Sequence, residues 1–119
     1  LIQNDYSWNA PTLVDIDNDG DRDLFITDSD YQIIFYKNTG TVSAPVFTLT
    51  TGSSDPFDGI STYWEYAQLQ FVDLDNDGDK DLIAAPGMAY DTYNAPIEYF
   101  KNNGTNSAPV FVSQTGTSN

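Results

Sequence analysis

Two nine-residue stretches of this chain hold an unusual density of carboxylates. The segments DIDNDGDRD and DLDNDGDKD begin at Asp15 and Asp73, and each places five aspartates on alternate residues. Carboxylates this close repel one another unless a cation compensates them. Hard oxygen donors on alternate residues, followed by glycine at the sixth position, are the arrangement that calcium loops use. The two stretches therefore predict two Ca²⁺ ions, one per stretch.

The loop positions have different expected roles. Carboxylates at positions 1, 3, 5 and 9 are the expected side-chain ligands, while position 7 is expected to supply its backbone carbonyl. Gly20 and Gly78 permit the sharp reversal that returns position 9 to the ion. Ile16 and Leu74 are expected to point away from the ion, into the sheet. The predicted metal residues are Asp15, Asp17, Asp19, Asp21, Asp23, Asp73, Asp75, Asp77, Asp79 and Asp81.

These loops differ from an EF-hand. An EF-hand needs a bidentate glutamate at position 12 and flanking helices, whereas position 12 here is Ile26 or Ala84 and both flanks are strand-like. Each loop is therefore expected to join two strands of a hairpin. Calcium is favoured over magnesium because the converging carboxylates leave little room for retained waters. The alternative is a solvated acidic loop that holds no metal.

Charge and composition exclude several classes of protein. Of the 18 acidic residues, ten lie in the two loops, and the formal charge of −14 provides no basic patch for nucleic acid. No apolar run is long enough to cross a bilayer, so membrane insertion is not expected. The absence of cysteine and histidine excludes disulfides, thiol catalysis and the usual zinc or copper sites. The chain does not begin with Met, so we expect a mature or excised piece.

The chain repeats itself. The offset between the copies is 58 residues at the acidic loops and 64 residues at the APVF segments, which begin at Ala44 and Ala108. Six extra residues therefore lie in the second copy, and we place them in PGMAYDTYNAP. Similarity at separated places with one localised insertion predicts two repeats, residues 1–54 and 55–119, that form one continuous unit.

Each copy indicates four short strands. β-branched and aromatic residues dominate these runs, and no stretch keeps a helical period. The expected strands cover residues 13–14, 24–26, 32–37 and 46–50 in the first copy, and 71–72, 82–84, 97–101 and 110–113 in the second. We therefore predict an all-β chain of two four-stranded antiparallel sheets, with an acidic loop in the first hairpin of each.

These motifs resemble the FG-GAP/VCBS repeats, which build integrin-α-type β-propellers and many secreted bacterial and fungal propellers, including some lectins. The resemblance rests on DxDxDGDxDL followed by YxNTG and APVF, and it covers nearly the whole chain. It implies that each copy is a four-stranded propeller blade with Ca²⁺ in the hairpin between its first two strands.

Two blades are fewer than the roughly four to eight that close a propeller, and a free pair would expose strand edges and apolar faces. We expect one of three arrangements: a fragment of a longer propeller, a ring closed by self-association, or an open head-to-tail fibre. Neighbouring repeats or further copies of the chain are therefore the expected partners.

Catalysis is not expected, because the clustered aspartates are committed to the ion and Glu65 and Glu98 are the only glutamates. The best interpretation is a calcium-stabilised module for adhesion or structural assembly. Its expected location is extracellular, because millimolar calcium outside cells would keep weak sites filled.

The alternative function is carbohydrate recognition, as a lectin-like propeller module or an accessory domain of a secreted polysaccharide-active enzyme. Aromatic side chains before each first strand could stack on sugar rings, or they could pack between blades. These candidates are Trp8, Tyr63, Trp64 and Tyr66. Asn103 opens an Asn-Gly-Thr sequon and is a predicted N-glycosylation site if the source glycosylates proteins. A glycan or an extracellular protein is therefore a further expected partner.

Overall fold

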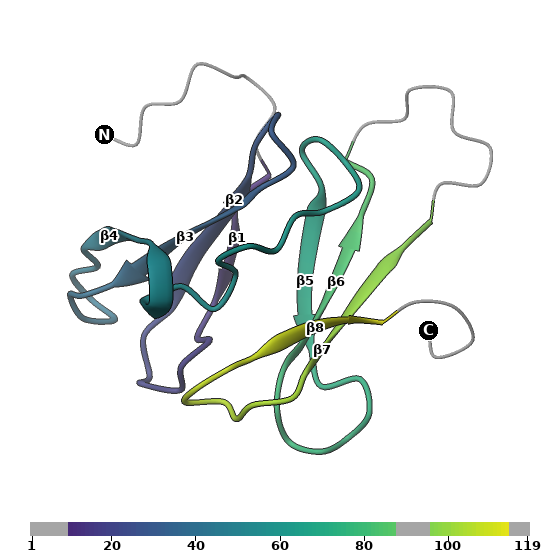
Figure 1. Ribbon diagram of the computed structural model, residues 1–119. Coiled ribbons are helices and arrows are strands. Elements are labelled where there is room, and N and C mark those ends of the chain that lie inside the picture. The colour runs from purple at the N-terminus through teal and green to yellow at the C-terminus, as the bar shows by residue number, and fades with distance from the viewer. Residues whose placement is uncertain (1–9, 88–95, 115–119) are drawn as a thin grey trace.

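Two four-stranded antiparallel sheets make up the computed structural model (Figure 1), which describes residues 10–87 and 96–114. The first sheet contains, in order, β1 (Thr12–Val14), β2 (Asp23–Thr27), β3 (Ile33–Asn38) and β4 (Phe47–Thr50). The second contains β5 (Gln68–Val72), β6 (Asp81–Ala85), β7 (Glu98–Asn102) and β8 (Phe111–Gln114). A short 3₁₀ helix, η1 (Gly52–Ser54), lies in the linker between the sheets.

The predicted fold class is confirmed. Strand order follows chain order in both sheets, as expected for hairpin-connected strands, and the sheets are consistent with propeller blades. The extra residues of the second copy fall between β6 and β7, where the repeat offset places them. The largest difference in strand bounds is at β5, which begins at Gln68 because its partner β6 continues to Ala85 and keeps the ladder paired. The turn of 3₁₀ helix was not predicted.

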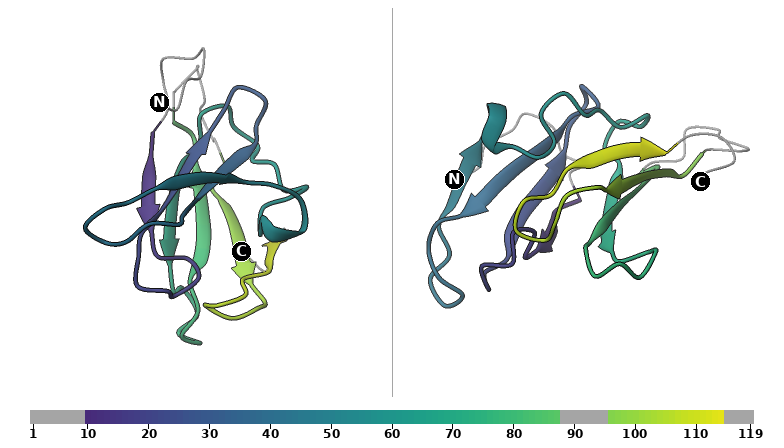
Figure 2. Two further views of the ribbon diagram at one scale, coloured as in Figure 1. Left: turned by 90° about the vertical axis from the view of Figure 1, so that its left-hand side faces the viewer. Right: turned by 60° about the horizontal axis from the view of Figure 1, so that its bottom comes forward.

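The two sheets lie next to each other (Figure 2), and an aromatic core joins them. Phe25 of the first sheet lies 4.8 Å from Phe71 of the second, measured between ring centroids. Phe57 belongs to the linker and is almost completely buried. Its ring stacks on Phe111 at 4.7 Å and meets the edge of Phe25 at 5.4 Å. Because aromatic pairs add to the burial of their own large surfaces, this cluster is the main contact between the sheets.

Each sheet also has a face directed away from the other. Side chains alternate along a strand, so Leu82 enters the shared core while Ile83 points to the opposite side. Ile16 is buried, as expected for the residue between the first two ligand positions. The matching expectation for Leu74 is wrong, because its side chain is 53% exposed. Ile16 packs into the core that the two sheets share, whereas Leu74 lies outside that core.

Both acidic loops lie at the same end of the molecule, at the bottom of Figure 1, since each connects the first two strands of its sheet. The turn between β2 and β3 lies at the opposite end. In the part of the chain that the structure describes, no helix has the length and apolar character needed to cross a membrane.

Candidate metal centre

Three carboxylates converge in each acidic loop. One oxygen from each of Asp15, Asp17 and Asp19 lies within 4.8 Å of the others, and the same holds for the second loop. The second group comprises Asp73, Asp75 and Asp77. The structure therefore brings together loop positions 1, 3 and 5, which supply oxygen ligands in the predicted scheme. Each group of three could bind a metal ion.

The backbone of each loop wraps around its first aspartate. Both oxygens of Asp15 accept hydrogen bonds from main-chain N–H groups, at 3.1 Å from Asp19 and 3.1 Å from Gly20. Asp73 accepts the equivalent bonds from Asp77 and Gly78 at 3.2 and 3.0 Å. Each glycine has a φ near +97°, at 96° and 98°, which residues with a side chain rarely adopt. The expected reversal at loop position 6 is therefore present.

Position 4 contributes a second left-handed residue that was not singled out from the sequence. Asn18 and Asn76 have φ values of 60° and 64°. Asparagine tolerates this region better than other non-glycine residues. The signal was available, because asparagine recurs at position 4 of both loops.

The ninth position holds a buried carboxylate. Asp23 is completely inaccessible, and its two oxygens accept hydrogen bonds from the N–H of Asn38 at 2.8 Å and of Ile16 at 3.4 Å. Burial raises the pKa of Asp23, and the two backbone hydrogen bonds oppose that rise. Asp23 thus ties the start of the loop to the end of β3. It is not part of the three-carboxylate group, so its role as a metal ligand stays a prediction.

Asp81 makes the same connections in the second sheet. It accepts hydrogen bonds from the N–H of Asn102 at 2.8 Å and of Leu74 at 3.2 Å. A third bond comes from the Tyr99 hydroxyl at 2.9 Å. Burial and this bond to Asp81 raise the pKa of Tyr99 to about 12. The role of Asp81 as a metal ligand likewise stays a prediction.

In each loop the residue at position 7 donates its backbone N–H to the carboxylate at position 5. The N–H of Asp21 donates to Asp19 at 3.0 Å, and the N–H of Asp79 donates to Asp77 at 3.0 Å. The bond from Asp21 is the main cause of the lowered pKa of Asp19. Coordination by the carbonyls at position 7 stays a prediction.

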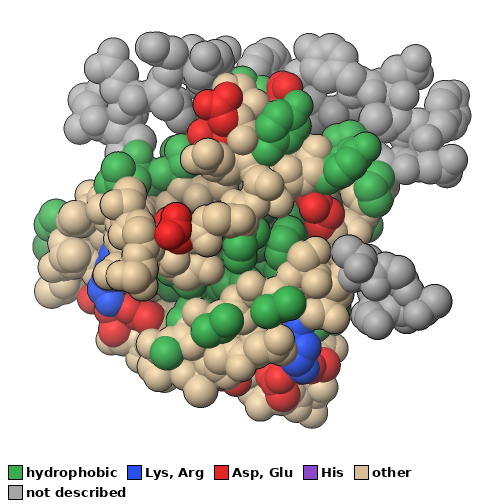
Figure 3. All heavy atoms as spheres, viewed as in Figure 1, with side chains coloured by type: hydrophobic (Ala, Val, Ile, Leu, Met, Phe, Trp, Pro, Cys, Tyr) green, Lys and Arg blue, Asp and Glu red, His purple; other side chains and the backbone are tan. Residues whose placement is uncertain are grey.

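A lysine from the third strand of each sheet reaches the acidic loop, which sequence reasoning missed. Lys37 pairs with Asp17 and lies 3.5 Å from Asp19, and Lys101 pairs with Asp75 and lies 3.4 Å from Asp77. These contacts raise the pKa of both lysines. In Figure 3, acidic and basic side chains gather at two places along the lower edge. The available signal was the lysine that precedes asparagine in both copies of the third strand.

The donor set fits a hard divalent cation. Carboxylate oxygens are the ligands that Ca²⁺ and Mg²⁺ prefer. In each loop a lysine ammonium already pairs with one of these carboxylates. One ammonium offsets a single charge of the three carboxylates in each group. The residues that would hold an ion are therefore Asp15, Asp17 and Asp19 in one loop and their counterparts in the other.

The aromatic candidates that the structure describes differ in their surroundings. Trp8 lies outside the described residues. Trp64 packs against the core, and its indole N–H donates to the carbonyl of Pro96 at 2.9 Å, so packing accounts for it. Tyr63 is 64% exposed, with its ring 4.8 Å from that of Trp64. Tyr66 is half-buried and donates its N–H to the carbonyl of Asp28.

The sequon and the turn asparagines lie at the end of each third strand. Asn38 and Asn102 are buried, and the side-chain oxygen of each accepts two backbone N–H groups of the turn that follows. Both asparagines therefore stabilise the turn that follows their strand. Asn103 is exposed in the turn after β7, and its glycosylation stays a prediction.

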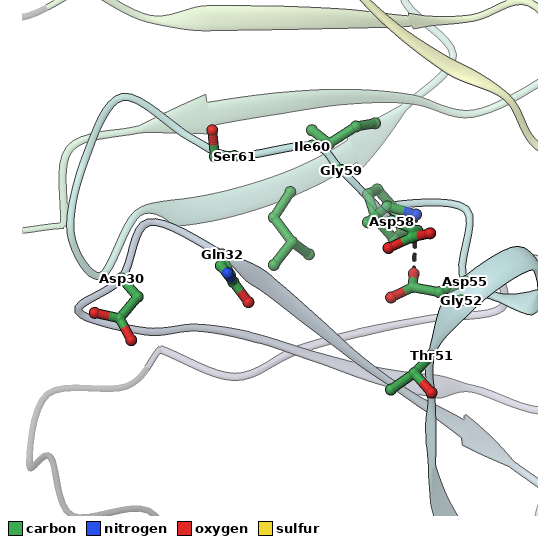
Figure 4. A pocket seen from close by; sticks show the side chains of 11 residues that line it. Asp30, Gln32, Thr51, Gly52, Asp55, Asp58, Gly59, Ile60 and Ser61 are labelled. Atoms are coloured by element: carbon green, nitrogen blue, oxygen red, sulfur yellow. Dashed lines mark hydrogen bonds between the residues drawn. The ribbon is translucent and has the colours of Figure 1, made fainter.

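A second polar feature lies away from the acidic loops, between the start of β3 and the linker (Figure 4). This pocket has a volume of about 440 Å³ and includes the carboxylates of Asp30, Asp55 and Asp58. Asp55 accepts a hydrogen bond from the N–H of Phe57 at 2.9 Å. Burial raises the pKa of Asp55 despite that bond, and the charge of Asp58 adds to the rise.

The fold and the paired loops define a class: an all-β repeat protein with an acidic loop in the first hairpin of each sheet. The model of the FG-GAP-like repeat family matches residues 15–84, from the first acidic loop to β6. The chain belongs to this family, whose members are structural repeat modules typical of extracellular proteins rather than enzymes. No curated protein and no solved structure matches the chain.

The two kinds of aspartate in each loop are expected to respond differently to substitution. Asp23→Ala should lower the free energy of unfolding by about 1–3 kcal/mol both with calcium and with chelator, because buried N–H groups lose their acceptor. Asp17→Ala should cost at most about 1 kcal/mol in chelator, since it removes a partly exposed ion pair with Lys37 and one acceptor of the Asp19 N–H, which keeps Asp15 as its other acceptor. Urea unfolding in both conditions measures the difference. Equal losses for the two variants in chelator would contradict the separate roles.

Proposed function

We propose that the chain is a calcium-stabilised extracellular repeat module that serves adhesion or structural assembly. The observation that carries the proposal is the pair of three-carboxylate groups, one in the first hairpin of each sheet. Membership of the FG-GAP-like family supports calcium as the ion, as does the all-oxygen donor set.

The ion's role is to hold the hairpin. Each loop connects two strands that pair directly, β1 with β2 and β5 with β6. Without a divalent cation, carboxylates less than 4.8 Å apart repel one another with one lysine to offset them. Binding to the folded loop therefore adds to the stability of the sheet by mass action.

An extracellular setting suits such sites. Calcium sites of extracellular modules commonly have dissociation constants of ~10⁻⁴–10⁻³ M, which millimolar calcium fills and cytosolic calcium does not. A filled site keeps the acidic end of each sheet ordered, and the module then presents its sheet faces to neighbours.

Removing calcium is expected to lower the melting temperature. At calcium concentrations about ten times the dissociation constant, each site contributes about 1.4 kcal/mol, so two sites correspond to a shift of roughly 10 °C. Differential scanning calorimetry with excess calcium or excess chelator measures the shift, with magnesium as the control ion. Identical melting curves in calcium and chelator would contradict the proposal.

The two sites can be separated by substitution. Asp17→Ala and Asp75→Ala should each reduce the calorimetric stoichiometry from about two ions to about one. A variant that loses both ions would instead indicate that the two sheets bind calcium as one unit.

Assembly is supported by the faces that the two sheets leave open. Leu13 on the outer side of the first sheet is 52% exposed, and its counterpart in the second sheet is Phe71, which packs in the shared core. Conversely, Ile83 and Tyr99 on the outer side of the second sheet correspond to Phe25 and Phe35 of that core. A second copy placed head to tail would therefore repeat the contact between the sheets.

Self-association is expected to depend on this outer face. Leu13→Lys should shift the particle towards the mass of one chain, because it places a charge where the repeated contact needs an apolar side chain. Multi-angle light scattering in calcium measures the mass, and Ser43→Lys on an exposed turn is the matched control. A discrete mass of a few chains would identify a ring, and an open-ended distribution a fibre. A wild-type mass of one chain would contradict self-association and leave blades of a longer propeller as the neighbours.

Carbohydrate recognition is the second candidate function, either as a lectin-like module or as an accessory domain of a polysaccharide-active enzyme. The observation that favours it is the pocket of about 440 Å³ beside the linker. Its carboxylates suit the hydroxyl protons of a sugar, and Ile33, Phe57 and Ile60 provide an apolar lining for a ring face.

A sugar that binds this pocket is expected to shift the amide resonances of Gly59 and Ile60. Titration of ¹⁵N-labelled protein with a panel of monosaccharides measures the shift, with affinities of about 1 mM expected for a single sugar. Asp55→Asn should weaken binding about tenfold, whereas Glu65→Gln outside the pocket should not. Absence of saturable shifts across the panel would remove this candidate.

A further inference from the structure

The turn after β7 is fastened to the second acidic loop through one residue, Asn106. Its backbone N–H donates to the carboxylate of Asp79 at 2.7 Å. Its side chain accepts a hydrogen bond from the N–H of Lys80 at 3.2 Å and donates one to the carbonyl of Gly78 at 2.6 Å. Three consecutive loop residues are thus held by a segment 26 to 28 positions further along the chain.

The first sheet provides a matched comparison. Its turn reads GTVSAPVF, and the turn of the second sheet reads GTNSAPVF, so Val42 replaces Asn106 in an otherwise identical octapeptide. The two turns also share their backbone geometry: Thr41 and Thr105 each donate an N–H to the alanine carbonyl three residues later, at 3.1 Å in both. Within this octapeptide the side chain at one position is therefore the difference between the turns, and Thr39, the residue before it that corresponds to Asn103, bonds within its own hairpin.

The side chain of Val42 has no donor or acceptor and cannot form the hydrogen bonds that Asn106 makes to its loop. The Val42 side chain is 78% exposed. A groove of about 400 Å³ is lined by Val42 and Pro45 of the turn and by Gly20 and Arg22 of the loop. In the second sheet the corresponding residues, Gly78 and Lys80, are hydrogen-bonded to Asn106.

The hydrogen bonds of Asn106 order the backbone of the second acidic loop. Asn106 restrains the backbone on both sides of Asp79, the position 7 residue whose carbonyl we expect to be a ligand. A loop that is already restrained loses less conformational entropy when it binds an ion. The first loop, with Val42 at the matched position, must lose that entropy on binding.

We propose that Asn106 is a positioning residue that makes the second acidic loop the tighter of two unequal calcium sites. This inference rests on the proposed calcium function. Calcium then fills the second loop first, and the first loop responds over a higher concentration range. The difference follows from the exchange of asparagine for valine in a repeated turn.

The amide resonances of Gly20 and Gly78 report the two loops separately in a titration of ¹⁵N-labelled protein with calcium chloride. We expect the midpoint for Gly78 to lie about tenfold below that for Gly20, equivalent to about 1.4 kcal/mol. Asn106→Val should raise the Gly78 midpoint towards that of Gly20. Val42→Asn should lower the Gly20 midpoint, and Ser107→Ala in the same turn should change neither.

A measurement without metal tests the hydrogen bonds between Asn106 and the second acidic loop. In excess chelator, the Lys80 amide should exchange with solvent more slowly than the Arg22 amide, and Asn106→Val should remove that difference. Val42→Asn keeps the test decisive if Asn106→Val fails to fold.

The possible failures are distinguishable. If neither glycine resonance moves up to about 10 mM calcium, well above the affinities of extracellular sites, the proposed calcium function is wrong. If both sites bind but their midpoints are equal, or do not respond to Asn106→Val and Val42→Asn, the calcium function stands and the role of Asn106 is overturned.

Discussion

The acidic end of each sheet is organised around a carboxylate that lies inside the protein. A buried carboxylate is costly unless hydrogen bonds replace its lost hydration, and Asp23 meets that requirement with two backbone N–H groups. One comes from the loop and the other from the end of β3, so the first three strands and the loop are linked. Asp81 does the same in the second sheet. The convergence of the three aspartates at positions 1, 3 and 5 of each loop depends on this link.

Once the loop is held in this way, its remaining carboxylates have little freedom to separate. Lys37 and Lys101 reduce the repulsion from the neighbouring strand, and the N–H groups that point at Asp15 and Asp73 reduce it further. A single ammonium against three carboxylates leaves a net negative site in each loop. The same constraint that stabilises the folded hairpin therefore creates the demand for a cation.

The contact between the two sheets depends on a residue of the linker that connects them. Phe57 in the linker fills the space between aromatic residues of both sheets, so the connection is part of the core rather than a spacer. Each outer face carries the counterparts of residues that the inner contact buries. Ile16 is buried and Leu74 is exposed for this reason. The two loops are alike, but Ile16 packs into the core that the two sheets share, whereas Leu74 has no neighbouring sheet among the described residues.

The local features of the protein were determined by the sequence alone: eight strands, two acidic loops with their glycine reversals, and the position of the insertion. Strand propensity and loop spacing act over a few residues, so they are visible in the order of the amino acids. Tertiary structure alone decided that Lys37 reaches Asp17, 20 residues earlier, that Asp23 is buried, and that Trp64 packs inward. It also decided that Asn106 is hydrogen-bonded to the second acidic loop, whereas the side chain of Val42 is exposed beside the first. These contacts join segments far apart in the chain, and their distances are set by the packing of the strands between them.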